Sequence, residues 1–193
     1  IQGDSNSTIA DLSDYPDGSA ALYSFDDQLN FLYPDPTGYC GARGSIENDP
    51  EGISQRVGKI VYDVNECGKG VTVVGAGNGF ANPIPFADGR TTIRLRVYTE
   101  LAGTEVALKI EDADDADRNA EMLKTTPNAG WSILEFDFSE KSIELNESFE
   151  KLMLIFEPSK CVYNEQLAPD CIYQPGADEY YFDDIQLLPG NSP

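Results

Sequence analysis

The sequence predicts an all-β domain, a two-sheet antiparallel β-sandwich. Short segments in which apolar and polar residues alternate recur along the chain, and clusters of Gly, Pro, Asn and Asp separate them. No long segment has the spacing of an amphipathic helix. A chain of 193 residues is long enough for one domain with a substantial core, and we expect that domain to span residues 20–188.

Three segments, residues 91–98, 104–110 and 131–138, alternate most clearly, so each should direct one row of side chains to the core and the other outward. The predicted inward rows are Ile93, Leu95 and Val97, then Val106, Leu108 and Ile110, then Leu134, Phe136 and Phe138. The predicted outward rows are Arg94, Arg96 and Tyr98, then Glu105, Ala107 and Lys109, then Trp131, Ile133, Glu135 and Asp137. Further strands are expected at residues 21–25, 59–64, 70–74, 151–156 and 180–187.

The two ends of the chain lack this alternation. Residues 1–19 are rich in Ser, Asp and Gly, which predicts a linker or a loosely attached arm, and residues 189–193 form a tail of the same character. No apolar run is long enough to span a bilayer, and the chain starts at Ile1 without a signal sequence. We therefore expect a processed or excised piece of a longer protein, monomeric as a module.

The charge and composition exclude several classes of function. With 34 acidic and 13 basic residues, the formal net charge of −21 repels nucleic acids and anionic membranes, so neither is an expected partner. Histidine is absent, which removes Ser-His-Asp and Cys-His catalysis and most zinc hydrolase sites.

The four cysteines, Cys40, Cys67, Cys161 and Cys171, predict disulfides, since their number is even and no CxxC pair occurs. Three pairings are possible, and we favour Cys40 with Cys67 and Cys161 with Cys171, because these partners are near in sequence. Disulfides imply an oxidising compartment, so an extracellular or cell-surface location is expected.

Several segments resemble a known family. They are Ala21–Asp27, Gly103–Glu111, Gly130–Ser139, Lys151–Phe156 and Tyr180–Leu187, the last with the form Tyr-Phe-Asp-Asp-Ile-x-Leu. In this order they resemble the jelly-roll carbohydrate-binding modules attached to secreted glycoside hydrolases and glycan-capture proteins of marine bacteria. The resemblance implies glycan binding without catalysis, often of β-glucans such as laminarin, and a structural calcium ion. The cysteines and the Pro-rich insert 33–44 depart from the pattern, which leaves the ligand open.

The outward rows supply a candidate glycan-binding face, because sugar rings stack on aromatic side chains while polar groups bind the hydroxyls. The candidate ligand-binding residues are Arg94, Arg96, Tyr98, Lys109, Trp131 and Glu135. Two alternatives stay open: Trp131 closes the edge of the core, and the arginines form salt bridges on an outer face. Aromatic residues in loops offer a second location for stacking.

Two pairs of aspartates predict a calcium site. Asp26 and Asp27 end the first strand and Asp183 and Asp184 lie in the last, and these strands are neighbours in jelly rolls, so their carboxylates could converge on a hard cation. Asp137 could contribute from a third strand. The alternative is that these aspartates are solvated at strand ends. The acidic run 111–117 lacks the glycine of an EF-hand loop and is interpreted as a solvated loop.

One motif points to catalysis. Glu135, Asp137 and Glu140 have the E-x-D-x-x-E spacing of laminarinase-type glycoside hydrolases, but the chain has one tryptophan where those enzymes use several. The favoured function is therefore non-catalytic binding of a polysaccharide, a β-1,3-glucan such as laminarin, which targets a tethered enzyme or capture protein to its substrate. The alternative is a small glycoside hydrolase or lyase that uses Glu135 and Glu140.

Overall fold

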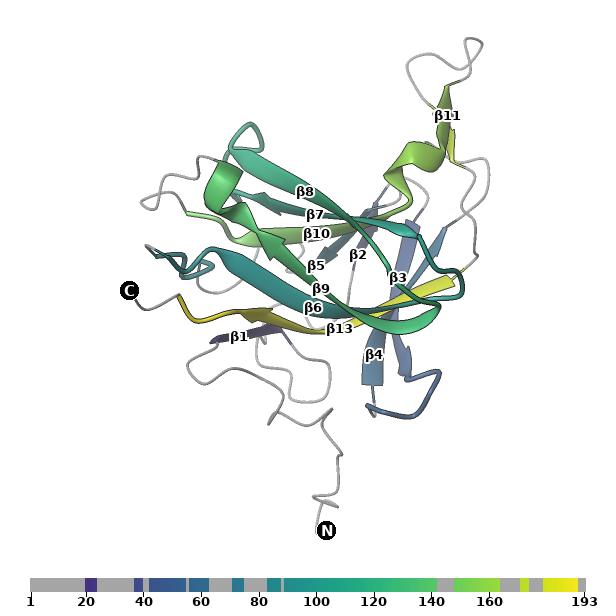
Figure 1. Ribbon diagram of the computed structural model, residues 1–193. Coiled ribbons are helices and arrows are strands. Elements are labelled where there is room, and N and C mark those ends of the chain that lie inside the picture. Colours follow the sequence, from purple (N-terminus) through teal and green to yellow (C-terminus); the bar gives the residue numbers. More distant parts are fainter. Residues whose placement is uncertain are drawn as a thin grey trace, which may run out of the picture.

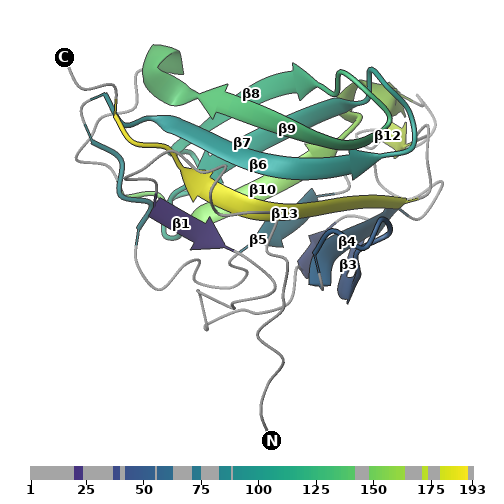
Figure 2. The same cartoon turned by 60° about the horizontal axis from the view of Figure 1, so that its bottom comes forward.

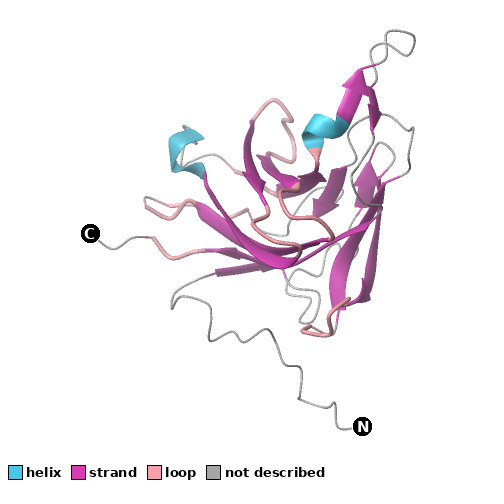
Figure 3. Ribbon diagram, turned by 45° about the vertical axis from the view of Figure 1, so that its right-hand side comes forward, coloured by secondary structure: helices cyan, strands magenta, loops and turns pink. Residues whose placement is uncertain are grey.

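In the computed structural model the described residues are 20–23, 37–39, 42–54, 56–62, 71–74, 83–87, 89–141, 148–163, 171–173 and 179–190. Nearly all of their regular structure is strand. The strands are β1 (Ala20–Tyr23), β2 (Thr37–Tyr39), β3 (Ala42–Asn48), β4 (Arg56–Tyr62), β5 (Val71–Val74), β6 (Thr92–Thr99), β7 (Glu105–Glu111), β8 (Asn119–Thr125), β9 (Gly130–Asp137), β10 (Lys151–Phe156), β11 (Cys161–Tyr163), β12 (Cys171–Tyr173) and β13 (Glu179–Leu187). Two short 3-10 helices, η2 (Phe138–Lys141) and η3 (Pro158–Lys160), complete the regular elements of these residues (Figure 3).

Two antiparallel sheets form the body of the molecule. A six-stranded sheet has the order β3-β4-β13-β6-β9, with β1 paired to β13, and a five-stranded sheet has the order β2-β5-β10-β7-β8. Figure 1 shows them as two layers, with β8, β7 and β10 above β9, β6 and β13, while the β11–β12 hairpin extends from the upper right. The predicted all-β, two-sheet antiparallel sandwich is therefore confirmed. No helix in the described part of the chain is long and apolar enough to cross a membrane.

The core lies between the two sheets and contains the predicted inward rows. All nine side chains that were predicted to point inward are buried. Eight of them lie on β6, β7 and β9, and the ninth, Phe138, directly follows β9. Ile93, Val106 and Phe136 are fully inaccessible. Strand β13 adds Tyr180 and Phe182, and the Tyr180 ring stacks on Phe156 of the opposite sheet with ring centres 4.5 Å apart. Because each strand alternates, the remaining side chains of the six-stranded sheet form its outer face, on which the candidate site lies.

The residues predicted as an N-terminal arm, 1–19, lie outside the described residues, as do residues 191–193 of the predicted tail. Strands were expected at five further places, and the structure has a strand at each of them, with bounds shifted by up to a few residues.

Candidate ligand-binding face

Three aromatic side chains lie in one row across the outer face of the six-stranded sheet. Tyr181 of β13 pairs in register with Tyr98 of β6, and Tyr98 pairs with Trp131 of β9. Adjacent rings meet edge to face, with centres 5.7 Å apart in both pairs and interplanar angles of 83° and 67°. Each of the three is half-buried, so part of each ring reaches the surface. We call these three residues the aromatic row; Figure 2 shows the strands that carry it, β13, β6 and β9, from this side.

A polar group extends the row beyond Tyr181. Lys59 of β4 pairs in register with Tyr181, and its ammonium lies 5.7 Å from the centre of the Tyr181 ring. Glu179 joins the two: its carboxylate accepts a hydrogen bond from the Tyr181 hydroxyl at 2.7 Å and forms an ion pair with Lys59 at 2.7 Å. Burial and the Glu179 carboxylate raise the pKa of Tyr181 above its usual range, so this phenol stays protonated and continues to donate.

Beside the aromatic row, Arg96 is buried against Trp131 and two aspartates. Its guanidinium carbon lies 4.5 Å from the centre of the Trp131 ring, in the geometry of a cation–π contact. The same guanidinium contacts Asp183 at 3.0 Å and Asp184 at 2.6 Å. Arg96 is only 8% exposed, so its charge is balanced inside the protein rather than by solvent.

A β-bulge allows both aspartates to reach one arginine. In a regular strand the side chains of Asp183 and Asp184 would point to opposite faces of the sheet. The register of β13 against β6 shifts between Asp183 and Gln186, and Asp184 adopts a positive φ of 51°, which is rare for a residue with a side chain. Burial and the neighbouring Asp184 carboxylate raise the pKa of Asp183 to about 7, against the opposing effect of Arg96.

The loop 49–54 between β3 and β4 folds around the carboxylate of Asp49. One oxygen, Oδ1, accepts hydrogen bonds from the Glu51 amide at 2.8 Å and from the Trp131 indole Nε1 at 3.1 Å. The other, Oδ2, accepts from the amides of Ile53 at 3.1 Å and Ser54 at 2.7 Å. Burial raises the pKa of Asp49, but the hydrogen bonds from Ser54, Glu51 and Trp131 outweigh it and lower the pKa, so the carboxylate is ionised at neutral pH.

This arrangement presents apolar ring surface together with one unused hydroxyl. The Trp131 indole N–H is bonded to Asp49 and the Tyr181 hydroxyl to Glu179, whereas the Tyr98 hydroxyl has no hydrogen-bond partner among the described residues. Stacking of a pyranose ring on the aromatic surfaces, with the Tyr98 hydroxyl bonding to a sugar hydroxyl, is the chemistry that such a face supports. Ion pairs already engage Lys59 and Arg96.

Five of the six predicted ligand-binding residues share this outer face. They are Arg94, Arg96, Tyr98, Trp131 and Glu135, placed there by the pairing of β6 with β9, in which Arg94 is opposite Glu135. For Arg96 the structure agrees with the salt-bridge alternative, since its guanidinium is buried on Asp183 and Asp184.

The sixth predicted residue, Lys109, does not lie there. It belongs to β7 of the five-stranded sheet, where it pairs with Glu111 at 2.8 Å. The prediction that it shares a face with the others was wrong because alternation separates inward from outward positions but does not say to which sheet a strand belongs. Sequence reasoning also missed Tyr181, Lys59 and Asp49, although Tyr181 follows directly from alternation along the predicted closing strand.

The predicted calcium ligands meet different surroundings. Asp183 and Asp184 bind Arg96, while Asp137 accepts hydrogen bonds from Thr91 Oγ1 and the Ser139 amide, both at 2.9 Å, at the start of η2. Asp26 and Asp27 lie outside the described residues. Within the described ranges no three His, Cys, Asp or Glu residues gather as a metal site. The calcium ion therefore stays a prediction from the family resemblance.

The predicted disulfides are likewise untested. Cys161 and Cys171 lie on the two strands of the β11–β12 hairpin, Cys161 opposite Tyr173 and Cys171 opposite Tyr163. Cys40 and Cys67 fall outside the described residues. The favoured pairing stays a prediction.

The acidic motif of the hydrolase alternative does not stay on one strand. Glu135 is exposed on the outer face of β9, but the strand ends at Asp137 and the chain turns into η2, which contains Glu140. Phe138, between them, is buried in the core. The two glutamates therefore do not project side by side from a continuous strand.

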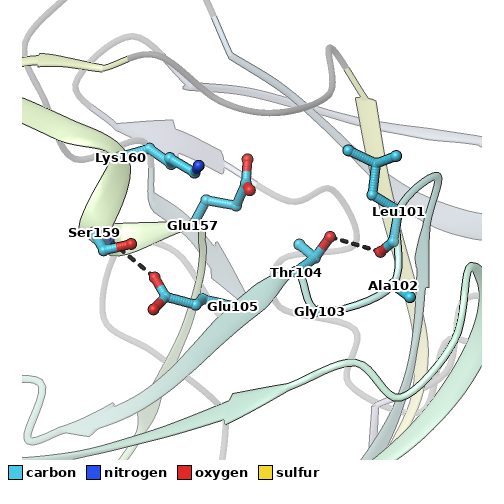
Figure 4. Close-up of a pocket in the computed structure, with 8 residues that line it drawn as sticks. All are labelled: Leu101, Ala102, Gly103, Thr104, Glu105, Glu157, Ser159 and Lys160. Carbon is cyan, nitrogen blue, oxygen red and sulfur yellow. Dashed lines mark hydrogen bonds between the residues drawn. The ribbon is translucent and has the colours of Figure 1, made fainter.

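A pocket of about 310 Å³ lies elsewhere, between the β6–β7 turn and the end of β10 (Figure 4). Its lining residues are Leu101, Ala102, Gly103, Thr104, Glu105, Glu157, Ser159 and Lys160. Several of its polar groups bond with one another or with the core: the Ser159 amide donates to Glu105, Thr104 Oγ1 to the Leu101 carbonyl, and the Tyr180 hydroxyl to Glu157. No aromatic ring lines it, and the aromatic row is the better candidate for a sugar.

Solved structures with similar folds are known, although no protein-family model and no curated protein sequence matches this chain. A family 11 carbohydrate-binding module from Clostridium thermocellum, in complex with a beta-1,3-1,4-mixed-linked tetrasaccharide, has a TM-score of 0.58 at 12% identity, over 91% of this chain and 98% of that one. A family 29 module complexed with cellulohexaose has a TM-score of 0.52 at 14% identity, over 89% and 91%.

An exo-beta-agarase structure is also similar, with a TM-score of 0.57 at 11% identity, and the match covers 90% of this chain but only 26% of that enzyme. At these identities the likeness shows the fold. The chain thus has the jelly-roll-like β-sandwich that carbohydrate-binding modules adopt.

Proposed function

We propose that this chain binds a neutral β-linked glucan on the outer face of the six-stranded sheet and performs no chemistry on it. The observation that carries the proposal is the aromatic row, in which Tyr181, Tyr98 and Trp131 lie on three adjacent strands. Neighbouring strands are about 4.8 Å apart, so the row spans roughly 10 Å across the sheet, enough for more than one sugar ring.

The electrostatics favour a neutral ligand. The formal net charge of −21 repels anionic polysaccharides such as alginate. The two cations that border the aromatic row are already paired, Lys59 with Glu179 and Arg96 with Asp183 and Asp184. An acidic glycan would meet net repulsion, and the two described cations that border the row are already engaged by carboxylates of the protein.

The ligands of proteins with this fold support the choice of glucan. The family 11 module was solved with a mixed-linked β-1,3-1,4 tetrasaccharide and the family 29 module with cellulohexaose, both β-linked glucans. Laminarin, a β-1,3-glucan, is the first polymer to test because of the family resemblance of the sequence. A module of this kind, secreted and tethered to an enzyme or capture protein, raises the local concentration of its partner at the polysaccharide.

Affinity electrophoresis in gels that contain laminarin, mixed-linkage β-glucan or alginate tests this proposal. We expect retardation by at least one neutral glucan and none by alginate. Trp131→Ala should weaken binding at least tenfold, since removing a large aromatic surface costs on the order of 2 kcal/mol. Leu123→Ala is the matched control, because Leu123 is 51% exposed and lies on the other sheet.

Two outcomes of this experiment would contradict the proposal. One is that none of the neutral glucans retards the protein, and the other is that the Trp131 and Leu123 variants lose binding equally. Thermal melts of each variant separate a loss of binding from a loss of fold.

A further inference from the structure

We infer that the loop 49–54 is a clamp that fixes the orientation of Trp131 before a ligand arrives, with Asp49 as the positioning residue. The consequence for affinity rests on the proposed function, whereas the clamp itself is a property of the free protein. Two separate contacts hold the indole: its N–H donates to Asp49 at 3.1 Å, and its face meets the Arg96 guanidinium at 4.5 Å.

These two contacts belong to one network of hydrogen bonds and ion pairs. Asp49 Oδ2 accepts a hydrogen bond from the Ser54 amide at 2.7 Å, and the Ser54 hydroxyl donates to Asp183 at 3.0 Å. Asp183 also accepts a hydrogen bond from Arg96 at 3.0 Å. The same guanidinium donates to the Ser54 hydroxyl and lies against the Trp131 ring. The loop therefore links the edge of the indole to the cation on its face.

The backbone just before Trp131 is adapted to this loop. Gly130 has a positive φ of 83°, and a Cβ added there would lie 3.1 Å from Glu51 Oε1. The Glu51 side chain of the loop thus lies over the start of β9, and the positive φ at this position favours glycine. Besides the bond from Asp49 to Trp131, this is a second place at which loop 49–54 lies close to the Trp131 segment.

The purpose of such a clamp is preorganisation. A side chain that must be immobilised on binding reduces affinity by about two- to tenfold, and a side chain already held avoids that loss. Asp49 suits this role because its carboxylate accepts four hydrogen bonds at once, three from its own loop and one from Trp131. A shorter or neutral side chain cannot satisfy all of these donors.

The single tryptophan makes the clamp directly measurable. In a ¹⁵N NMR spectrum the protein gives one indole N–H signal, and its hydrogen exchange reports the bond to Asp49. We expect the indole N–H of the unchanged protein to exchange at least tenfold more slowly than in the urea-unfolded chain. In Asp49→Ser, whose hydroxyl can still accept a loop amide but cannot reach the indole, exchange should accelerate at least tenfold.

Two comparisons complete the design. Asp114→Ser is the matched control, because Asp114 is an exposed aspartate in the turn between β7 and β8, and it should leave the indole signal unchanged. Asp49→Asn keeps one oxygen that can accept from Trp131 but turns its NH2 group toward the Ile53 and Ser54 amides, so it should restore only part of the protection. Laminarin affinity should fall about two- to tenfold in Asp49→Ser and by less in Asp49→Asn.

Each outcome decides one part of the inference. An indole N–H that is unprotected in the unchanged protein overturns the clamp whether or not the variants fold, and so does equal exchange in folded Asp49→Ser and Asp114→Ser. Indole exchange that accelerates without any change in affinity overturns the positioning role. A protein that binds no neutral glucan but has a protected indole contradicts the proposed function and leaves the clamp standing.

Discussion

The guanidinium of Arg96 lies 4.5 Å from the centre of the Trp131 ring while it contacts both carboxylates of the Asp183–Asp184 bulge. One buried cation therefore joins an acidic pair inside the sheet to the aromatic surface on its outer face. Removing either partner of such a buried pair is costly, because the remaining charge is left without compensation.

Arg96→Met should accordingly destabilise the protein by about 3–5 kcal/mol. Arg94→Met, two positions along the same strand at a half-buried site, is the control and should have a smaller effect. Denaturant unfolding of both variants at neutral pH measures the difference. Equal free energies of unfolding would show that Arg96 does not balance the buried carboxylates.

The raised pKa of Asp183 predicts how stability depends on pH. Since the pKa is about 7 in the folded protein and 3.8 is the ordinary value, the folded state holds the proton more tightly than the unfolded chain does. The stabilisation from this group is complete below about pH 4 and is lost as the pH rises through about 7. Asp183→Asn removes that titration, so its free energy of unfolding should fall less than that of the unchanged protein between pH 5 and pH 8. Parallel pH profiles for the two proteins would contradict the assignment.

The sequence predicts the layers of this fold well because alternation is a local property. Ile93, Leu95 and Val97 are buried as expected, since a strand of alternating residues can bury its apolar row in only one way. Strands β2, β3, β8, β11 and β12 were not predicted. In β8 the alternation is weak, because only Ala120 and Met122 pack against the core.

The site was predictable only in part, because its decisive contacts are long-range. Trp131 and Tyr98 were identified by residue type and parity, but the bond from Trp131 to Asp49 joins residues 82 positions apart. Lys109 was misplaced because parity does not assign a strand to a sheet. The bulge at Asp184 also escaped prediction, and it allows Asp183 and Asp184 to contact the same arginine, Arg96.

The two tyrosines of the aromatic row should respond differently to loss of their hydroxyls. The Tyr98 hydroxyl has no hydrogen-bond partner among the described residues, whereas that of Tyr181 donates to Glu179 at 2.7 Å. Tyr98→Phe should weaken glucan binding about fivefold, the equivalent of one hydrogen bond of about 1 kcal/mol. Tyr181→Phe keeps its ring and should bind within about twofold of the unchanged protein. Isothermal titration with laminarin oligosaccharides compares them, and the reverse order would show that Tyr181 contacts the sugar through its hydroxyl.

The hydrolase alternative predicts activity that the geometry of the acidic motif does not favour. Retaining hydrolysis needs two carboxyl groups about 5 to 5.5 Å apart. Glu135 projects from β9, but Glu140 follows the turn into η2, and the carboxylate of Asp137 between them is bound to Thr91 and Ser139. We therefore expect no more reducing sugar from laminarin with the unchanged protein than with Glu135→Gln or Glu140→Gln, in a prolonged incubation at high protein concentration. Release of reducing sugar that either substitution abolishes would contradict the proposal that the chain binds without catalysis.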